Sequence, residues 1–157
     1  MTLNRDGSAL ESIPLKLMIV AVVASLSVLP AAEALDGLRN RDFVRRAELQ
    51  LDALMLAVQT LAVEGPGAVR TASLDFSCEG GLRFSSLTLG DREDGPCRSS
   101  VVLEFANGAR MVRSALEPIV LMRSPDGCSL TVLQPVFDLR LTATMNDGAS
   151  FVLVEEV

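Results

Sequence analysis

Residues 17–32, LMIVAVVASLSVLPAA, form an uncharged apolar run between Lys16 and Glu33. As a helix this run would be about 24 Å long, which is shorter than the ~30 Å hydrocarbon core of a bilayer. Residues 12–15 lengthen it if the Lys16 ammonium extends towards the lipid headgroups. The segment therefore has the composition of a membrane span and is short for one.

Three interpretations fit the apolar run. It can be the hydrophobic region of a secretory signal cleaved after Ala34, at the small-residue site Ala32-Glu33-Ala34. It can be a buried core helix or a simple membrane anchor. It can also be the assembly helix of a filament subunit, and that interpretation rests on the residues in front of the run.

Residues 5–12, RDGSALES, are a short polar leader with a glycine, followed by small residues and one acid. This leader, and the block ESIPLKL at residues 11–17 in particular, resembles archaeal pilin-like proteins of the type IV pilin superfamily, which carry a class III signal peptide. The resemblance implies that a prepilin peptidase of the membrane cuts beside Gly7 and leaves Ser8 first, while the apolar helix stays on the mature chain. Asp6 departs from the family pattern, because a basic residue often precedes the glycine.

Glu11, Pro14 and Pro30 are the candidate assembly residues. The partial positive charge of a helix N-terminus favours a carboxylate at Glu11. The resemblance implies that this carboxylate pairs with the α-amino group of a neighbouring subunit, and a solvated side chain is the alternative. Pro14 falls near the start of the helix, where proline costs little. Pro30 is interior and should kink or locally unwind the helix, or else end the span before a separate helix.

Residues 35–64 contain one glycine and no proline, and they predict a second helical stretch. We expect residues 8–64 to form one long, kinked N-terminal helix after a leader of residues 1–7. The helix should end at Gly65-Pro66-Gly67. Its second part carries an apolar stripe at helical spacing that should pack on the following domain. The stripe consists of Leu51, Leu54, Met55, Val58, Leu61 and Ala62.

Beyond Gly67 the apolar residues recur at every second position, which is typical of half-buried strands. Seven or eight short strands are predicted, so residues 65–157 should form an antiparallel β-sandwich-like head and the whole chain an α+β fold. Residues that favour turns separate the predicted strands, and one bulge is predicted within a strand. The turns are expected at Asn107-Gly108, Ser124–Gly127 and Asn146–Gly148, and the bulge at Ser85-Ser86.

The composition excludes several classes of function. The 157 residues include 14 Lys and Arg, 20 Asp and Glu, and no His, Trp or Tyr, for a net charge of −6. Histidine-based catalysis and histidine-containing metal sites therefore cannot form. An acidic chain whose aromatic residues are six Phe lacks the basic groove and stacking platform that bind single-stranded nucleic acid. We expect no enzymatic activity, no cofactor, no metal ion and no nucleic-acid partner.

Cys78, Cys97 and Cys128 all lie in the predicted head. An exported head would allow one disulfide and one remaining thiol, with three possible pairings between which the spacing does not choose. Buried or surface thiols are the alternative.

The resemblance implies a structural subunit of a type IV pilus-like extracellular filament, anchored in the cell membrane through its N-terminal helix before assembly. Its head would be extracellular, and its partners would be identical or related pilin subunits. The alternative is a secreted or membrane-anchored β-sandwich binding domain whose signal peptide is cleaved near residue 34. The positive-inside rule opposes the first topology, because more basic residues follow the span than precede it. Arg5 and Lys16 precede it, and Arg39, Arg41, Arg45 and Arg46 follow it.

Overall fold

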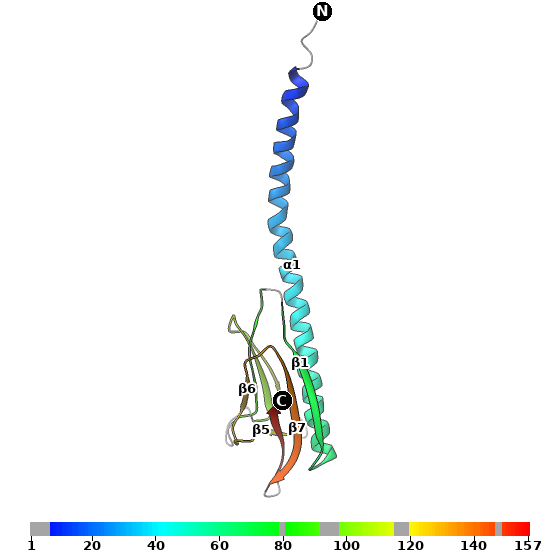
Figure 1. The fold of residues 1–157 in the computed structure, drawn as a ribbon, viewed down its shortest axis with the longest axis vertical. Coiled ribbons are helices and arrows are strands. Elements are labelled where there is room, and N and C mark those ends of the chain that lie inside the picture. Colours follow the sequence, from blue (N-terminus) through cyan, green and yellow to red (C-terminus); the bar gives the residue numbers. More distant parts are fainter. Residues whose placement is uncertain (1–6, 79–80, 92–97, 115–119, 147–148) are drawn as a thin grey trace, which may run out of the picture. The chain divides into compact units, whose positions relative to one another are not determined.

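A computed structural model describes residues 7–78, 81–91, 98–114, 120–146 and 149–157 of the chain. Its side chains are described from Leu15 onwards, except at positions 27, 29 and 146 within these ranges. The order of the described elements is a helix, α1 (Gly7–Glu64), followed by strands β1 to β8 (Figure 1). The chain divides into two compact units, an N-terminal unit of residues 1–39 and a head unit of residues 40–157.

The described part of the N-terminal unit consists of the first half of α1. The helix runs without interruption through Pro14 and Pro30. The expected unwinding at Pro30 is therefore absent, and Pro30 does not end the helix. A proline removes one backbone hydrogen bond, and the bonds of the neighbouring turns are enough to keep the helix continuous here.

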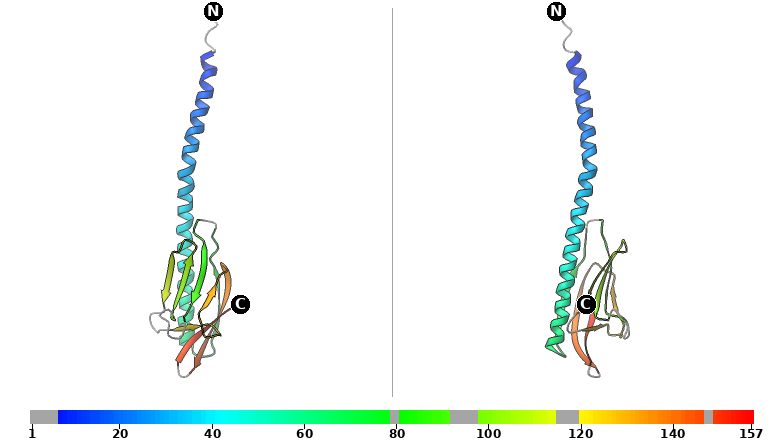
Figure 2. Two further views of the ribbon diagram at one scale, coloured as in Figure 1. Left: turned by 90° about the vertical axis from the view of Figure 1, so that its left-hand side faces the viewer. Right: turned by 180° about the vertical axis from the view of Figure 1, so that it is seen from behind.

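The head unit contains two four-stranded sheets, seen from two further sides in Figure 2. The strand orders are β1-β7-β8-β5 and β4-β3-β2-β6. The described strand pairs are antiparallel except for β5 and β8, which run parallel with Leu121 opposite Phe151. The α+β fold class is confirmed, with this parallel pair as an unexpected exception. The strands are β1 (Val69–Asp75), β2 (Phe84–Leu89), β3 (Ser100–Phe105), β4 (Arg110–Ser114), β5 (Leu121–Arg123), β6 (Leu130–Val132), β7 (Val136–Asn146) and β8 (Ala149–Glu156).

The helix end, two turns and the bulge lie at the residues predicted from the sequence. Gly65 ends α1, and its amide donates to the Leu61 carbonyl at 3.1 Å. A turn at residues 107–108 joins β3 to β4, and the register of β2 against β3 shifts between residues 84 and 86, as expected for a bulge. The turn at residues 124–127 is closed by two backbone hydrogen bonds. Of the predicted turn at residues 146–148, residues 147 and 148 lie outside the described ranges.

The second half of α1 contributes one face to the hydrophobic core of the head unit. The Phe43 ring meets the Phe105 ring of β3 edge-on, with centroids 5.8 Å apart. Each large apolar side chain buried in this way contributes about 1.5–3 kcal/mol to folding. We call this surface the inner face of α1, and it confirms the predicted packing of the stripe. Its buried residues are Phe43, Ala47, Leu51, Leu54, Met55, Val58 and Leu61.

Gly90 follows β2 at a point where the chain passes close to β5. Its backbone is left-handed, with φ at +72°. A Cβ atom at this position would lie 2.3 Å from the carbonyl oxygen of Met122, which is far inside van der Waals contact. The Met122 amide is itself bonded to the Arg98 carbonyl at 2.8 Å, so the β5 backbone is held in place.

We predict that Gly90→Ala lowers the free energy of unfolding by roughly 2–4 kcal/mol, from the left-handed backbone and the overpacking together. Chemical unfolding of the full chain in detergent, followed by circular dichroism, measures this. Gly81→Ala is the matched control, because its Cβ would meet only the Asn40 side chain, at 3.8 Å. Equal unfolding midpoints for the two variants would contradict the close approach.

Candidate functional site

The N-terminal unit has an apolar surface that nothing within the chain covers. Every side chain described between Leu15 and Arg39 is exposed. Water-soluble monomers seldom leave so much contiguous apolar surface in solvent, so this segment is suited to contact lipid or other chains. By length and composition α1 could cross a membrane. The large exposed apolar residues here are Leu15, Leu17, Met18, Ile19, Val20, Val22, Val23, Leu26, Val28, Leu35 and Leu38.

Ser25 is a polar residue inside this apolar segment. Its hydroxyl donates to the Val22 carbonyl at 2.8 Å, within the same helix. An unsatisfied hydroxyl is costly in an apolar surrounding, and this bond removes that cost without a partner from elsewhere. The segment is thus suited to an apolar environment despite its serine.

The predicted processing and assembly residues lie along the first half of α1. Gly7 is the first residue of the helix and Ser8 the second. Glu11 and Pro14 belong to the first turns, but their side chains lie outside the described part of the structure. Pro30 is exposed near the end of the apolar run. These residues are spread along one helix and do not converge on a common point.

The three cysteines of the head differ in their surroundings. Cys78 is half-buried and packs against the margin of the core. Cys97 lies outside the described residues. Cys128 is exposed, and its thiol is free.

Polar side chains on the second half of α1 bind the strands and loops of the head unit. The Gln50 side chain donates to the Asp75 carbonyl and accepts from the Asp75 amide, both at 2.8 Å. The Asn40 side chain accepts from the Leu82 amide at 3.0 Å. These contacts were not foreseen from the sequence, because they join residues 25 and 42 positions apart and no periodic pattern marks them.

A third polar contact involves β4. The Arg113 guanidinium lies 2.8 Å from the Asp52 carboxylate and 3.5 Å from that of Glu48. The hydrogen bond with Asp52 raises the pKa of Arg113. Asn40, Gln50 and Arg113 together join the second half of α1 to the strands and loops of the head unit.

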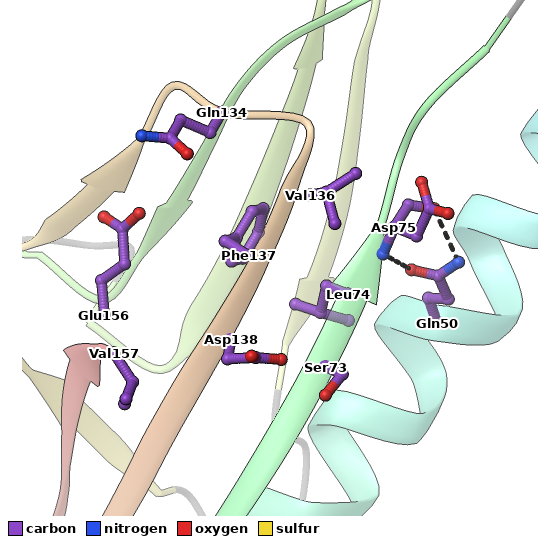
Figure 3. Close-up of a pocket in the computed structure, with 10 residues that line it drawn as sticks. All are labelled: Gln50, Ser73, Leu74, Asp75, Gln134, Val136, Phe137, Asp138, Glu156 and Val157. Atoms are coloured by element: carbon purple, nitrogen blue, oxygen red, sulfur yellow. Dashed lines mark hydrogen bonds between the residues drawn. The ribbon is translucent and has the colours of Figure 1, made fainter.

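A shallow cavity of about 490 Å³ lies beside the contact between Gln50 and Asp75 (Figure 3). Three carboxylates and two amides line it, and no Lys or Arg does. The cavity can therefore accept hydrogen bonds from a cationic or donor-rich group. Within the described residues, no group of three or more His, Cys, Asp or Glu is arranged to hold a metal ion. The lining residues are Gln50, Ser73, Leu74, Asp75, Gln134, Val136, Phe137, Asp138, Glu156 and Val157.

The pKa of the Asp75 carboxylate is lowered by its neighbours. Hydrogen bonds from Ser77, first from its side chain and then from its backbone amide at 2.8 Å, lower the pKa of Asp75. The positive charge of Arg46 lowers it further. The ionised form of Asp75 is thus favoured in the folded chain.

Comparison of the chain with models of protein families, with curated proteins and with solved structures gave no match.

We predict that Asp75 makes the stability of the head depend on pH. Because its pKa is lower in the folded state, its contribution is complete above the unfolded-state value of about 3.9 and is lost as the pH falls through the folded-state value. The free energy of unfolding of the full chain in detergent is measured from neutral pH to below about pH 4. As the pH falls, this free energy should decrease less steeply in Asp75→Asn than in the native protein. Ser77→Ala removes the largest cause of the shift and should have the same effect to a smaller degree. A native slope in Asp75→Asn would contradict this assignment.

Proposed function

We propose that this chain is a structural subunit of a type IV pilus-like extracellular filament, anchored in the membrane through the first half of α1 before assembly. The leader around Gly7 supports this proposal by its resemblance to prepilin leaders. The different environments of the two halves of α1 in the structure also support it.

The observation that carries the proposal is the contrast between the two halves of α1. Every described side chain from 15 to 39 is exposed, although most are apolar, whereas the inner face at residues 43–61 is buried in the core of the head unit. One helix thus belongs to a folded head and also presents apolar surface that needs an external cover. Lipid would supply the cover before assembly, and the helices of other subunits would supply it afterwards, at ~25 cal/mol for each Å² of apolar surface removed from water.

The orientation in the membrane is the second part of the proposal. The basic residues after the span favour a cytoplasmic head, whereas the proposal needs an extracellular one. Arg39 pairs with Asp36 one turn earlier, at 3.8 Å, and this partly offsets its charge. Asp42 stands among the remaining arginines, but acids count little in this rule, so the proposed orientation rests on the resemblance of the leader.

A secreted or membrane-anchored binding domain is the second candidate. The small-residue site at residues 32–34 and the acidic cavity of the head unit favour it. In that case the apolar run would be removed as a signal, and the cavity would be the functional surface.

N-terminal sequencing of the mature protein separates the two candidates. We expect the mature chain to begin at Ser8, or at Gly7 if the cut falls after Asp6. Electron microscopy of the cells that supply the mature protein should show filaments that contain the chain. A mature chain that begins at Leu35 would instead establish the secreted domain.

Cys128 provides a test of orientation, because its thiol is exposed and free. A membrane-impermeant maleimide added to intact cells should label the chain, and the labelling should fall in Cys128→Ser. Labelling of Cys128 only after the cells are lysed would place the head in the cytosol and refute the proposed orientation.

A further inference from the structure

A shallow groove of about 520 Å³ lies on the second half of α1, at residues that soon follow the exposed apolar segment in the sequence. Its side chains come from two neighbouring rows of the helix, one at residues 40, 44 and 48 and the other at residues 41 and 45. Residues four positions apart lie next to each other on one side of a helix. We call this depression the arginine groove, and its lining residues are Asn40, Arg41, Val44, Arg45 and Glu48.

Four arginines follow the uncharged run, and they differ in the acids around them. Arg39 pairs with an acid one turn earlier, at 3.8 Å, and the charge of Arg46 acts on Asp75 of the head unit. Arg41 and Arg45 are exposed, and neither forms an ion pair with another described residue. The two guanidinium groups of the arginine groove are therefore available to an anion from outside the chain.

The two ends of the arginine groove are held by contacts with the rest of the head unit. At one end, the Asn40 side chain accepts a hydrogen bond from the Leu82 amide at 3.0 Å. At the other end, the Glu48 carboxylate lies 3.5 Å from the Arg113 guanidinium, which offsets its negative charge. Val44 is half-buried between these ends and, with the aliphatic stems of the arginines, gives the groove an apolar floor.

The chemistry of the arginine groove suits a phosphate that is attached to an apolar body. Guanidinium groups bind phosphate oxygens through paired, charge-assisted hydrogen bonds, and two of them one turn apart can hold the same phosphate. A lipid adds an apolar part that can lie against Val44. Inorganic phosphate has no such part and would leave the apolar floor in contact with water.

The place of the arginine groove along the chain also favours a lipid. Arg41 follows Ala32, the last residue of the uncharged run, by nine positions, which is about 13.5 Å along a helix. Side chains of a helix lean towards its N-terminus, and arginines extend their charged ends towards lipid headgroups. The headgroup layer lies directly outside the hydrocarbon core of a bilayer. Both arginines of the groove therefore follow the span at a distance that brings this layer within reach.

We infer that the arginine groove binds the phosphate of a membrane lipid, with Arg41 and Arg45 on the phosphate oxygens and Val44 against the apolar part of the lipid. This inference rests on one part of the proposed function, the membrane anchor formed by the first half of α1, and it requires no filament. Lipid phosphates are present in both leaflets, so the inference holds for either orientation of the head.

Native mass spectrometry of the full-length chain in detergent measures the retention of single lipids. The probe is phosphatidylglycerol, and the comparison is an uncharged diacyl glycolipid that has no phosphate. The native chain should retain one phosphatidylglycerol in preference to the glycolipid. Arg41→Gln/Arg45→Gln should weaken this binding roughly tenfold or more, because both guanidinium contacts with the phosphate are lost.

Arg39→Gln/Arg46→Gln is the matched control, because it removes the same charge from the same stretch of α1 and leaves the arginine groove intact. It should retain phosphatidylglycerol nearly as well as the native chain. Arg41→Lys/Arg45→Lys keeps the charge without the planar fork and should bind with intermediate affinity. All four positions are exposed, so these variants should fold, which circular dichroism checks.

The outcomes distinguish this inference from the proposed function. Equal losses in the two glutamine variants would show general charge attraction and overturn the arginine groove. Equal retention of the glycolipid, or displacement of the lipid by an equal concentration of inorganic phosphate, would overturn the assignment to a lipid phosphate. Each of these results would leave the filament standing. A mature chain that begins at Leu35, found by N-terminal sequencing without any lipid, would instead refute the proposed function.

Discussion

The burial of the inner face of α1 is the interaction on which the rest of the molecule depends. The eight described strands form two sheets, and the hydrophobic core of the head unit includes one side of residues 43–61. The head therefore cannot be separated from this half of the helix without exposing leucines that now have no contact with water. Because the same helix continues towards the N-terminus as an exposed apolar segment, the folding of the head and the presentation of that segment are linked through one continuous backbone.

Much of this arrangement could be predicted from the sequence, because periodic burial leaves a periodic pattern. The helical stripe from Leu51 to Leu61 is buried as expected, since side chains three and four positions apart share a face. The strands are marked by alternation, and Gly65 and Gly108 mark positions of positive φ. Such features are local, so each can be recognised from a few neighbouring residues.

The remaining features depend on contacts between distant residues, which periodicity does not encode. The predicted set of seven or eight short strands did not indicate that β5 would pair in parallel with β8. No feature of the sequence around Gly90 indicates that the Met122 carbonyl lies close to it. Likewise, nothing in the sequence indicated that Gln50 would bind the backbone of Asp75. The acidic cavity was missed for the same reason, since its carboxylates come from β1, β7 and β8.

The hydrogen bonds of Gln50 have a consequence for the exposed edge of the β1 sheet. β1 is an edge strand, and an edge strand offers free amides and carbonyls to any extended segment that reaches it. The Gln50 amide occupies both groups of Asp75 as a neighbouring strand would, so this end of the edge is closed by a side chain. At this point the chain is thereby protected against the edge-to-edge pairing through which exposed strands of two molecules aggregate.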